Sequence, residues 1–134
     1  MLMTREMDYA LRILRALYRG GQMSAATVAR KEHMPKAVTL KILKQLHTAG
    51  FLDSRRGSNG GYLLQESCGQ LYLGDVFCAL GEPLCINRCQ QPEYQCENAS
   101  ESGCSICQEL NRIQELLDKE LYRTPLSEVF KEDP

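Results

Sequence analysis

The chain has 134 residues and a formal net charge of −1, and 43% of its residues are hydrophobic and 25% charged. This composition is typical of one small globular domain and excludes both two large domains and wholesale disorder. The longest stretch without a charged residue, 20–29, is shorter than the roughly 20 apolar residues of a membrane-spanning helix. Charged residues also occupy the N-terminal stretch where a signal peptide would be apolar. We therefore expect a cytoplasmic protein with no membrane partner.

Three helices are predicted first along the chain. Apolar residues at helical spacing indicate a helix over about 4–19, followed by two glycines that end it. A short helix is predicted over about 24–31, with Ser24 as its N-cap. A third helix is expected from Pro35, which suits a first helical turn, to Gly50, which suits a C-terminus.

The pattern then changes to that of a β-hairpin. Segments 51–56 and 62–65 are predicted as short strands, and the turn between them contains three glycines. A short helix is expected next, over about 74–80. Three helices followed by a glycine-rich hairpin predict a winged helix-turn-helix.

The remaining chain is predicted to form a loop and a long helix. Segment 85–103 is polar and cysteine-rich and has no hydrophobic periodicity, so its order must come from something other than a core. Apolar residues then recur at spacings of four, three, four and four, at Ile106, Leu110, Ile113, Leu117 and Leu121. This seam favours a helix that pairs with a second copy, although it could also pack within its own domain. The predicted fold class is mainly α, with a β-hairpin wing and a long C-terminal dimerisation helix.

Charge is distributed unevenly between the two halves of the chain. Residues 1–66 contain eleven Lys and Arg against five Asp and Glu, whereas residues 67–134 contain five against twelve. A basic half beside an acidic half suggests that only the first faces a polyanion. We therefore expect a DNA-binding region at 1–66 and a cysteine loop with a dimerisation helix at 67–134.

The predicted DNA contacts follow from the geometry of a helix-turn-helix. Its second helix lies in the major groove of double-stranded DNA, with side chains near its N-terminus reaching base edges. The candidates for base contacts are Lys36, Ala37 and Thr39, and those for phosphate contacts are Lys41 and Lys44. In the wing, the candidates are Arg55, Arg56 and Gly57, because an arginine can enter a narrow minor groove where glycine lets the backbone approach.

The seven cysteines are the strongest compositional signal. Their odd number prevents complete pairing within one chain, and without an export signal a reducing compartment favours metal binding or redox chemistry over structural disulfides. Five of them lie in one stretch, at Cys85, Cys89, Cys96, Cys104 and Cys107. Thiolates are the main ligands of iron–sulfur clusters, so this stretch is a candidate site for a 2Fe–2S or 4Fe–4S cluster.

Two segments resemble a known family of regulators. The motif Asp8-Tyr9-Ala10-Leu11-Arg12 and the wing sequence from Arg56 to Leu64, together with the cysteine loop, resemble the Rrf2-type winged-helix transcription regulators, which include IscR-like and NsrR-like iron–sulfur proteins. The resemblance covers about residues 2–130. It implies a homodimeric transcription regulator, and many such proteins hold an iron–sulfur cluster that modulates DNA binding.

The resemblance also implies a set of metal ligands. The three loop cysteines of the family match Cys89, Cys96 and Cys104. IscR-like members have a histidine three residues further on, where this chain has Cys107, and NsrR-like members can use an aspartate of the partner subunit that matches Asp8. The predicted ligands are therefore Cys89, Cys96, Cys104 and Cys107, with Asp8 as the alternative fourth ligand. A set in which Cys85 replaces one of these residues is a further alternative.

Other functions remain open at this stage. Zinc is the main alternative metal, although only Cys104 and Cys107 have the short spacing of a structural zinc pair. A thiol-based redox switch without metal is a second alternative. An iron–sulfur carrier or scaffold without DNA binding belongs to another class, which the basic first half argues against. No phosphate loop, nucleophile elbow or paired carboxylate motif is recognisable, so we do not expect an enzyme.

Overall fold

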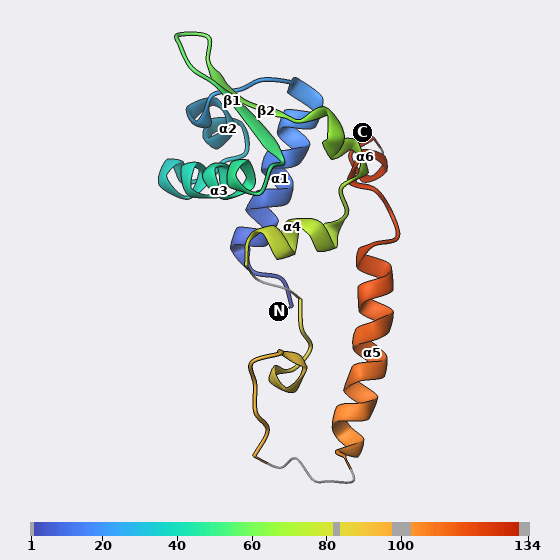
Figure 1. The fold of residues 1–134 in the computed structure, drawn as a ribbon. Helices are drawn as coiled ribbons and strands as arrows, with labels where there is room; N and C mark the ends of the chain where they lie inside the picture. Colours follow the sequence, from blue (N-terminus) through green and yellow to red (C-terminus); the bar gives the residue numbers. More distant parts are fainter. Residues whose placement is uncertain (1, 82–83, 98–102, 132–134) are drawn as a thin grey trace.

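The computed structural model describes residues 2–81, 84–97 and 103–131. The N-terminal half consists of α1 (Arg5–Gly20), α2 (Ala25–Lys31), α3 (Lys36–Thr48) and the antiparallel strands β1 (Leu52–Arg55) and β2 (Gly61–Leu64). The C-terminal half contains the 3-10 turns η1 (Glu66–Gln70) and η2 (Arg88–Gln90) and the helices α4 (Leu73–Ala79), α5 (Ser105–Leu121) and α6 (Leu126–Val129). This architecture, drawn in Figure 1, confirms the predicted mainly α, winged fold.

Local capping explains where the first helices begin and how they are connected. The Thr4 hydroxyl accepts a hydrogen bond from the Met7 amide at the start of α1, and Ser24 accepts one from the Thr27 amide at the start of α2. The predicted N-cap of the second helix is thus confirmed. Between α2 and α3, His33 has a φ of +54°, a left-handed conformation that makes the turn tight.

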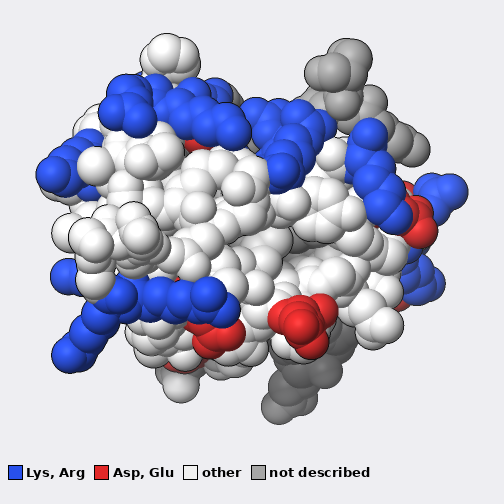
Figure 2. Space-filling model, turned by 90° about the horizontal axis from the view of Figure 1, so that it is seen from above, with Lys and Arg blue, Asp and Glu red and all other residues white. Residues whose placement is uncertain are grey.

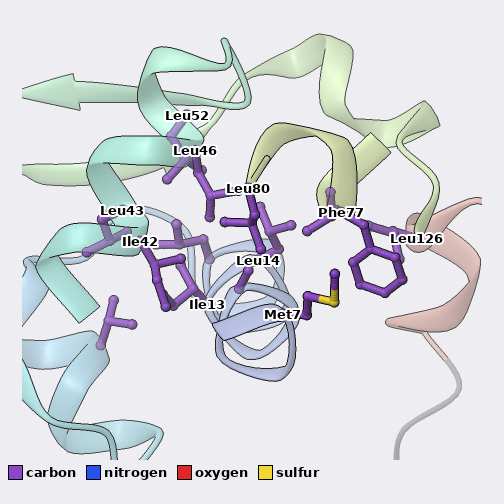
Figure 3. Close-up of a cluster of buried hydrophobic side chains, with 14 of the residues drawn as sticks. Met7, Ile13, Leu14, Ile42, Leu43, Leu46, Leu52, Phe77, Leu80 and Leu126 are labelled. Atoms are coloured by element: carbon purple, nitrogen blue, oxygen red, sulfur yellow. The ribbon is translucent and has the colours of Figure 1, made fainter. Parts of the chain in front are cut away.

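The hydrophobic core lies where α1, α3 and α4 meet (Figure 3). It includes Ile13, Leu14 and Ile42, all at most 1% exposed. The C-terminal α6 returns to this core, since the Leu126 amide donates to the Leu71 carbonyl and the Arg19 guanidinium donates to the Phe130 carbonyl. The core therefore contains residues from both sides of the predicted boundary at residue 66.

Helix α5 extends away from this core (Figure 1). None of its residues is buried. Leu110, Leu117 and Leu121 are half-buried, whereas Ile106, Ile113 and Leu116 are exposed by 70%, 39% and 51%. Residues at these spacings lie on one side of a helix, so the predicted apolar seam is only partly covered within the chain. Its uncovered edge continues to Leu116, which the seam did not contain. Among the described residues, no helix is long and apolar enough to span a membrane.

Candidate DNA-binding surface and cysteine site

Helix α3 presents part of the predicted set of DNA-contacting residues to solvent. Lys36, Ala37 and Lys44 are exposed. Thr39, in contrast, is fully buried, and its hydroxyl donates to the Pro35 carbonyl over 3.0 Å. The sequence prediction of Thr39 as a base contact does not fit this structure, because the side chain faces the core and its hydroxyl already has a partner.

Lys41 is exposed but already paired with an acidic residue. Its Nζ lies 2.6 Å from Glu6 Oε1 on α1, and the two side chains are 58% and 36% exposed. An ion pair at this exposure contributes little to stability, about 0–1 kcal/mol. Its consequence is electrostatic, since Glu6 offsets one positive charge beside the predicted phosphate contacts.

The wing is exposed and carries the predicted basic residues near its tip. Arg55, Arg56 and Gly57 are all exposed. Figure 2, which views the molecule from above, shows Lys and Arg side chains along several edges of this face around a mostly uncharged centre. The face is therefore suited to contact with a polyanion.

Contacts from the α1–α2 connection hold the wing in place. Met23 pairs with Tyr62 through two backbone hydrogen bonds of 3.0 and 2.8 Å, and Gln22 Nε2 donates to the Asn59 carbonyl over 2.5 Å. A Cβ atom at Gly61 would lie 2.4 Å from the Met23 carbonyl oxygen, so glycine is needed for this close approach. We expected the wing glycines to let the backbone approach DNA, and Gly61 instead lets two parts of the chain approach each other.

The cysteine site is formed by the loop around η2 and the N-terminal end of α5. Burial raises the pKa of Cys89 most, and a hydrogen bond with Cys107 and the charge of Cys107 raise it further. A backbone hydrogen bond lowers it, and the charge of Cys96 adds a smaller increase. Cys89 thus interacts with two of the other predicted ligands, most strongly with Cys107. Cys104 is the N-cap residue of α5 and is also partly exposed. Among the described residues, however, no three His, Cys, Asp or Glu side chains are arranged to hold a metal ion.

Two glutamines fasten this loop to α5. Gln114 donates to the Leu84 carbonyl and accepts from the Ile86 amide, and Gln90 donates to the Leu110 carbonyl. These contacts dock η2, and with it Cys89, against the helix that carries Cys107. Sequence reasoning missed both glutamines, because their partners lie 20 to 30 residues away along the chain.

The remaining predicted or possible ligands lie elsewhere. Asp8 on α1 is paired with Arg12 over 3.1 Å and lines a groove formed by α1 and α6, which contains no cysteine. Cys68 is buried, and its thiol lies 2.9 Å from the Phe51 carbonyl. Cys85 lines a pocket against α4. Within one chain, therefore, neither Asp8 nor Cys68 belongs to the group around Cys89.

Three N-terminal helices followed by a two-stranded wing define a winged helix-turn-helix protein. The match to the Rrf2 family, described as iron-dependent transcriptional regulators, extends over residues 3–132, and the chain belongs to this family. It is therefore a DNA-binding transcription regulator and not an enzyme.

Solved structures show the same fold. CymR (YrzC) of B. subtilis, the global cysteine regulator, is similar with a TM-score of 0.78 at 21% identity, covering 98% of each chain. IscR of T. potens has a TM-score of 0.73 at 16% identity, covering 97% of this chain and 86% of that one. CymR of Staphylococcus aureus has a TM-score of 0.70 at 21% identity, covering 98% and 99%. At these identities, the likeness shows the shared fold alone.

Proposed function

We propose that the protein acts in the cytoplasm as a homodimeric regulator whose affinity for duplex DNA is modulated by an iron–sulfur cluster. The cluster would be held by Cys89, Cys96, Cys104 and Cys107. The observation that supports this most is the docking of the loop that carries Cys89 on α5, the helix that carries Cys107, together with the hydrogen bond between these two thiols. When bound, the cluster would supply redox and ligand-exchange chemistry that a set of thiols alone lacks.

The chemistry of the donor set fits such a group. Thiolates are soft ligands, and an all-cysteine set suits either 2Fe–2S or 4Fe–4S. Of the five cysteines in the loop stretch, Cys85 faces a different pocket, which leaves four. Cys68 lies outside the stretch and is buried. Metal binding would draw them together and so stabilise the loop, since metal binding and local folding are coupled.

The cluster is tested by anaerobic purification with ultraviolet–visible spectra and counts of iron and sulfide. Cys89→Ala and Cys96→Ala should each abolish or severely destabilise the cluster, because each removes a thiolate. Cys68→Ala is the matched control and should keep the full iron content. A protein that binds one zinc and no iron under anaerobic reconstitution would overturn the proposal.

A second pair of variants distinguishes the two candidates for the fourth ligand. If Cys107 is the ligand, Cys107→Ala should lose the cluster absorption while Asp8→Ala keeps it. If Asp8 of the partner subunit is the ligand, the outcomes reverse. Because Asp8 and the cysteines lie apart within one chain, the second case also requires the cluster to bridge two chains.

The DNA-binding surface is tested by fluorescence anisotropy over a range of salt concentrations. Arg56→Ala should weaken operator binding, and Lys44→Ala should weaken binding to all duplexes while reducing the magnitude of the salt slope by about 1. Arg123→Ala, two residues after the C-terminal end of α5, is the matched control and should bind as the wild type does. If Arg56→Ala and Lys44→Ala both bind DNA as the wild type does, this surface is not the DNA-binding surface.

The dimer is assigned to the exposed apolar face of α5. Ile113 and Leu116 are 39% and 51% exposed, a large apolar exposure for adjacent turns of one helix. Ile113→Asp with Leu116→Asp should give monomers, because pairing would bury charge at the seam. Gln108→Asp with Asn111→Asp adds the same charge at exposed polar positions and should leave the dimer intact. If sedimentation velocity finds dimers of both double variants, this face of α5 does not form the dimer, and the seam packs only within its own chain.

A thiol-based regulator without a cluster is the second candidate. It is favoured by the absence, among the described side chains, of three donors arranged for a metal, and CymR of B. subtilis, named a cysteine regulator, shares the fold. This candidate predicts DNA binding that responds to thiol oxidation in a protein free of iron. Zinc would give one metal per site with no visible absorption.

A further inference from the structure

A pocket of about 200 Å³ lies where α4, the start of the cysteine loop and the C-terminal half of α5 meet. Two cysteines outside the proposed cluster set, Cys78 on α4 and Cys85 in the loop, both line it. Cys78 is exposed and Cys85 is partly exposed, so small solutes in water can reach both thiols. The pocket therefore brings together two thiols outside the proposed cluster set.

Tyr122 gives Cys78 a polar neighbour. A Cβ atom at Gly74 would lie 2.3 Å from Cζ of Tyr122, so the absence of a side chain there lets the tyrosine ring lie directly on α4. In this position the Tyr122 hydroxyl lies 3.9 Å from Cys78 Sγ. Partial burial, followed by the nearby Cys78, raises the pKa of Tyr122 to about 12. The phenol thus keeps its proton and can donate to the sulfur at neutral pH.

Cys85 is held on the other wall of the pocket. Gln114 bonds to the Leu84 carbonyl over 2.8 Å and to the Ile86 amide over 2.9 Å, the residues on either side of Cys85. Gln114 in turn donates to Asp118 over 2.8 Å on the same helix. The backbone around Cys85 is therefore fastened to the helix that also carries Tyr122 at its end.

We propose that Cys78 and Cys85 form a peroxide-reactive dithiol that closes this pocket with a disulfide. The Cys78 thiolate attacks one oxygen of a hydroperoxide such as hydrogen peroxide, the O–O bond breaks, and Cys78 becomes a sulfenic acid as the second oxygen leaves in water. The Cys85 thiolate then attacks the Cys78 sulfur, the S–O bond breaks and a second water leaves. Two thiols are oxidised, one peroxide is reduced, and the start of the loop is joined covalently to α4.

The roles of the two cysteines follow from their positions. Cys78 is the better target for a solute because it is the more exposed thiol, and the Tyr122 hydroxyl lies 3.9 Å from its sulfur. Cys85 is the resolving thiol because it is the less exposed of the two and lines the same pocket as Cys78. A disulfide holds the two Cα atoms about 4.4–6.8 Å apart, so its formation would fix the loop start against α4.

The test uses the whole metal-free chain, treated with one equivalent of hydrogen peroxide and then with iodoacetamide. Combined trypsin and chymotrypsin digestion cuts between the two residues, after Leu80, so that a disulfide joins two separate peptides. The proposal expects peptides linked through Cys78 and Cys85, with loss of both thiols to alkylation. Cys85→Ala should leave Cys78 as a sulfenic acid that dimedone traps, whereas Cys68→Ala should behave as the wild type.

A further variant tests the contribution of the tyrosine. In the Cys85→Ala protein, Tyr122→Phe should slow the trapping of Cys78 by dimedone about fivefold, the loss expected for one hydrogen bond. Cys85 linked to Cys89, or Cys78 still fully alkylated after peroxide treatment, would overturn the proposal. Because the readout needs neither iron nor DNA, this failure is distinguishable from failure of the proposed cluster function.

Discussion

Gly61 offers a direct test of how the wing is positioned. A Cβ atom there would lie 2.4 Å from the Met23 carbonyl oxygen and 2.5 Å from the Met23 carbonyl carbon, both backbone atoms that cannot rotate away. Gly61→Ala should therefore separate Met23 from Tyr62 and break the two hydrogen bonds between them, of 3.0 and 2.8 Å. At about 0.5–1.5 kcal/mol each, these bonds sum to about 1–3 kcal/mol of the unfolding free energy, which is also the usual cost of overpacking.

The expected changes are measurable in stability and in DNA affinity. A loss of this size should lower Tm by about 3–10 °C in a calorimetric scan. Displacing a wing arginine from DNA should weaken operator binding by about 5- to 150-fold, since such contacts contribute about 1–3 kcal/mol. Gly69→Ala is the matched control, because a Cβ there would meet nothing within 4 Å. Equal Tm and equal affinity in the two variants would contradict the role assigned to Gly61.

Two further variants address the core and the charge of the DNA-binding face. Ile42→Ala, at a fully buried position, should destabilise the fold by about 2–5 kcal/mol in urea denaturation, whereas Leu2→Ala, at a position 62% exposed, should change stability by less than about 0.5 kcal/mol. Glu6→Gln should release Lys41 and strengthen DNA binding, with a salt slope steeper by about 0.9, whereas Glu109→Gln on α5 should leave the slope unchanged. Equal slopes in these two variants would mean that Lys41 does not face DNA.

Much of the fold follows from local sequence signals. The predicted helix over 106–121 is α5, which begins one residue earlier, and the predicted N-cap of α2 is Ser24 as expected. Helix α6 was not predicted, because four residues are too few for a helical repeat to be recognised. Long-range contacts place it, namely the hydrogen bonds of Arg19 to Phe130 and of Leu126 to Leu71.

The candidate sites were predictable to different degrees. Thr39 lies three and seven residues before Ile42 and Leu46, which places it on the same buried face of α3, so its burial could have been read from helical spacing. The contacts of Gln114 and Gln90 could not be predicted from the sequence, because a polar side chain carries no signal for a backbone partner 20 to 30 residues away. The cysteines themselves were evident from composition, but which of them face one another depends on these long-range contacts.

Helix α4 connects the cysteine region to the DNA-binding helices. Val76 and Phe77 are buried in the core shared with α1 and α3, whereas Gly74 and Cys78 face the end of α5. A short helix with one face in the core and the other against α5 would transmit a displacement of α5 toward α3. If cluster binding changes DNA affinity by some factor, then DNA binding must change cluster affinity by the same factor.

Gly74→Ala tests whether this connection carries the coupling. The added Cβ would lie 2.3 Å from Tyr122 Cζ and 2.4 Å from its Cε2, so the tyrosine ring must leave α4. The iron content should remain that of the wild type, because no proposed ligand is touched. The ratio of operator Kd between cluster-free and cluster-loaded protein, about 5 to 150 for a typical allosteric coupling, should fall toward one. Gly69→Ala should keep the wild-type ratio, and a Gly74→Ala protein that also keeps it would show that the coupling bypasses the contact between Tyr122 and α4.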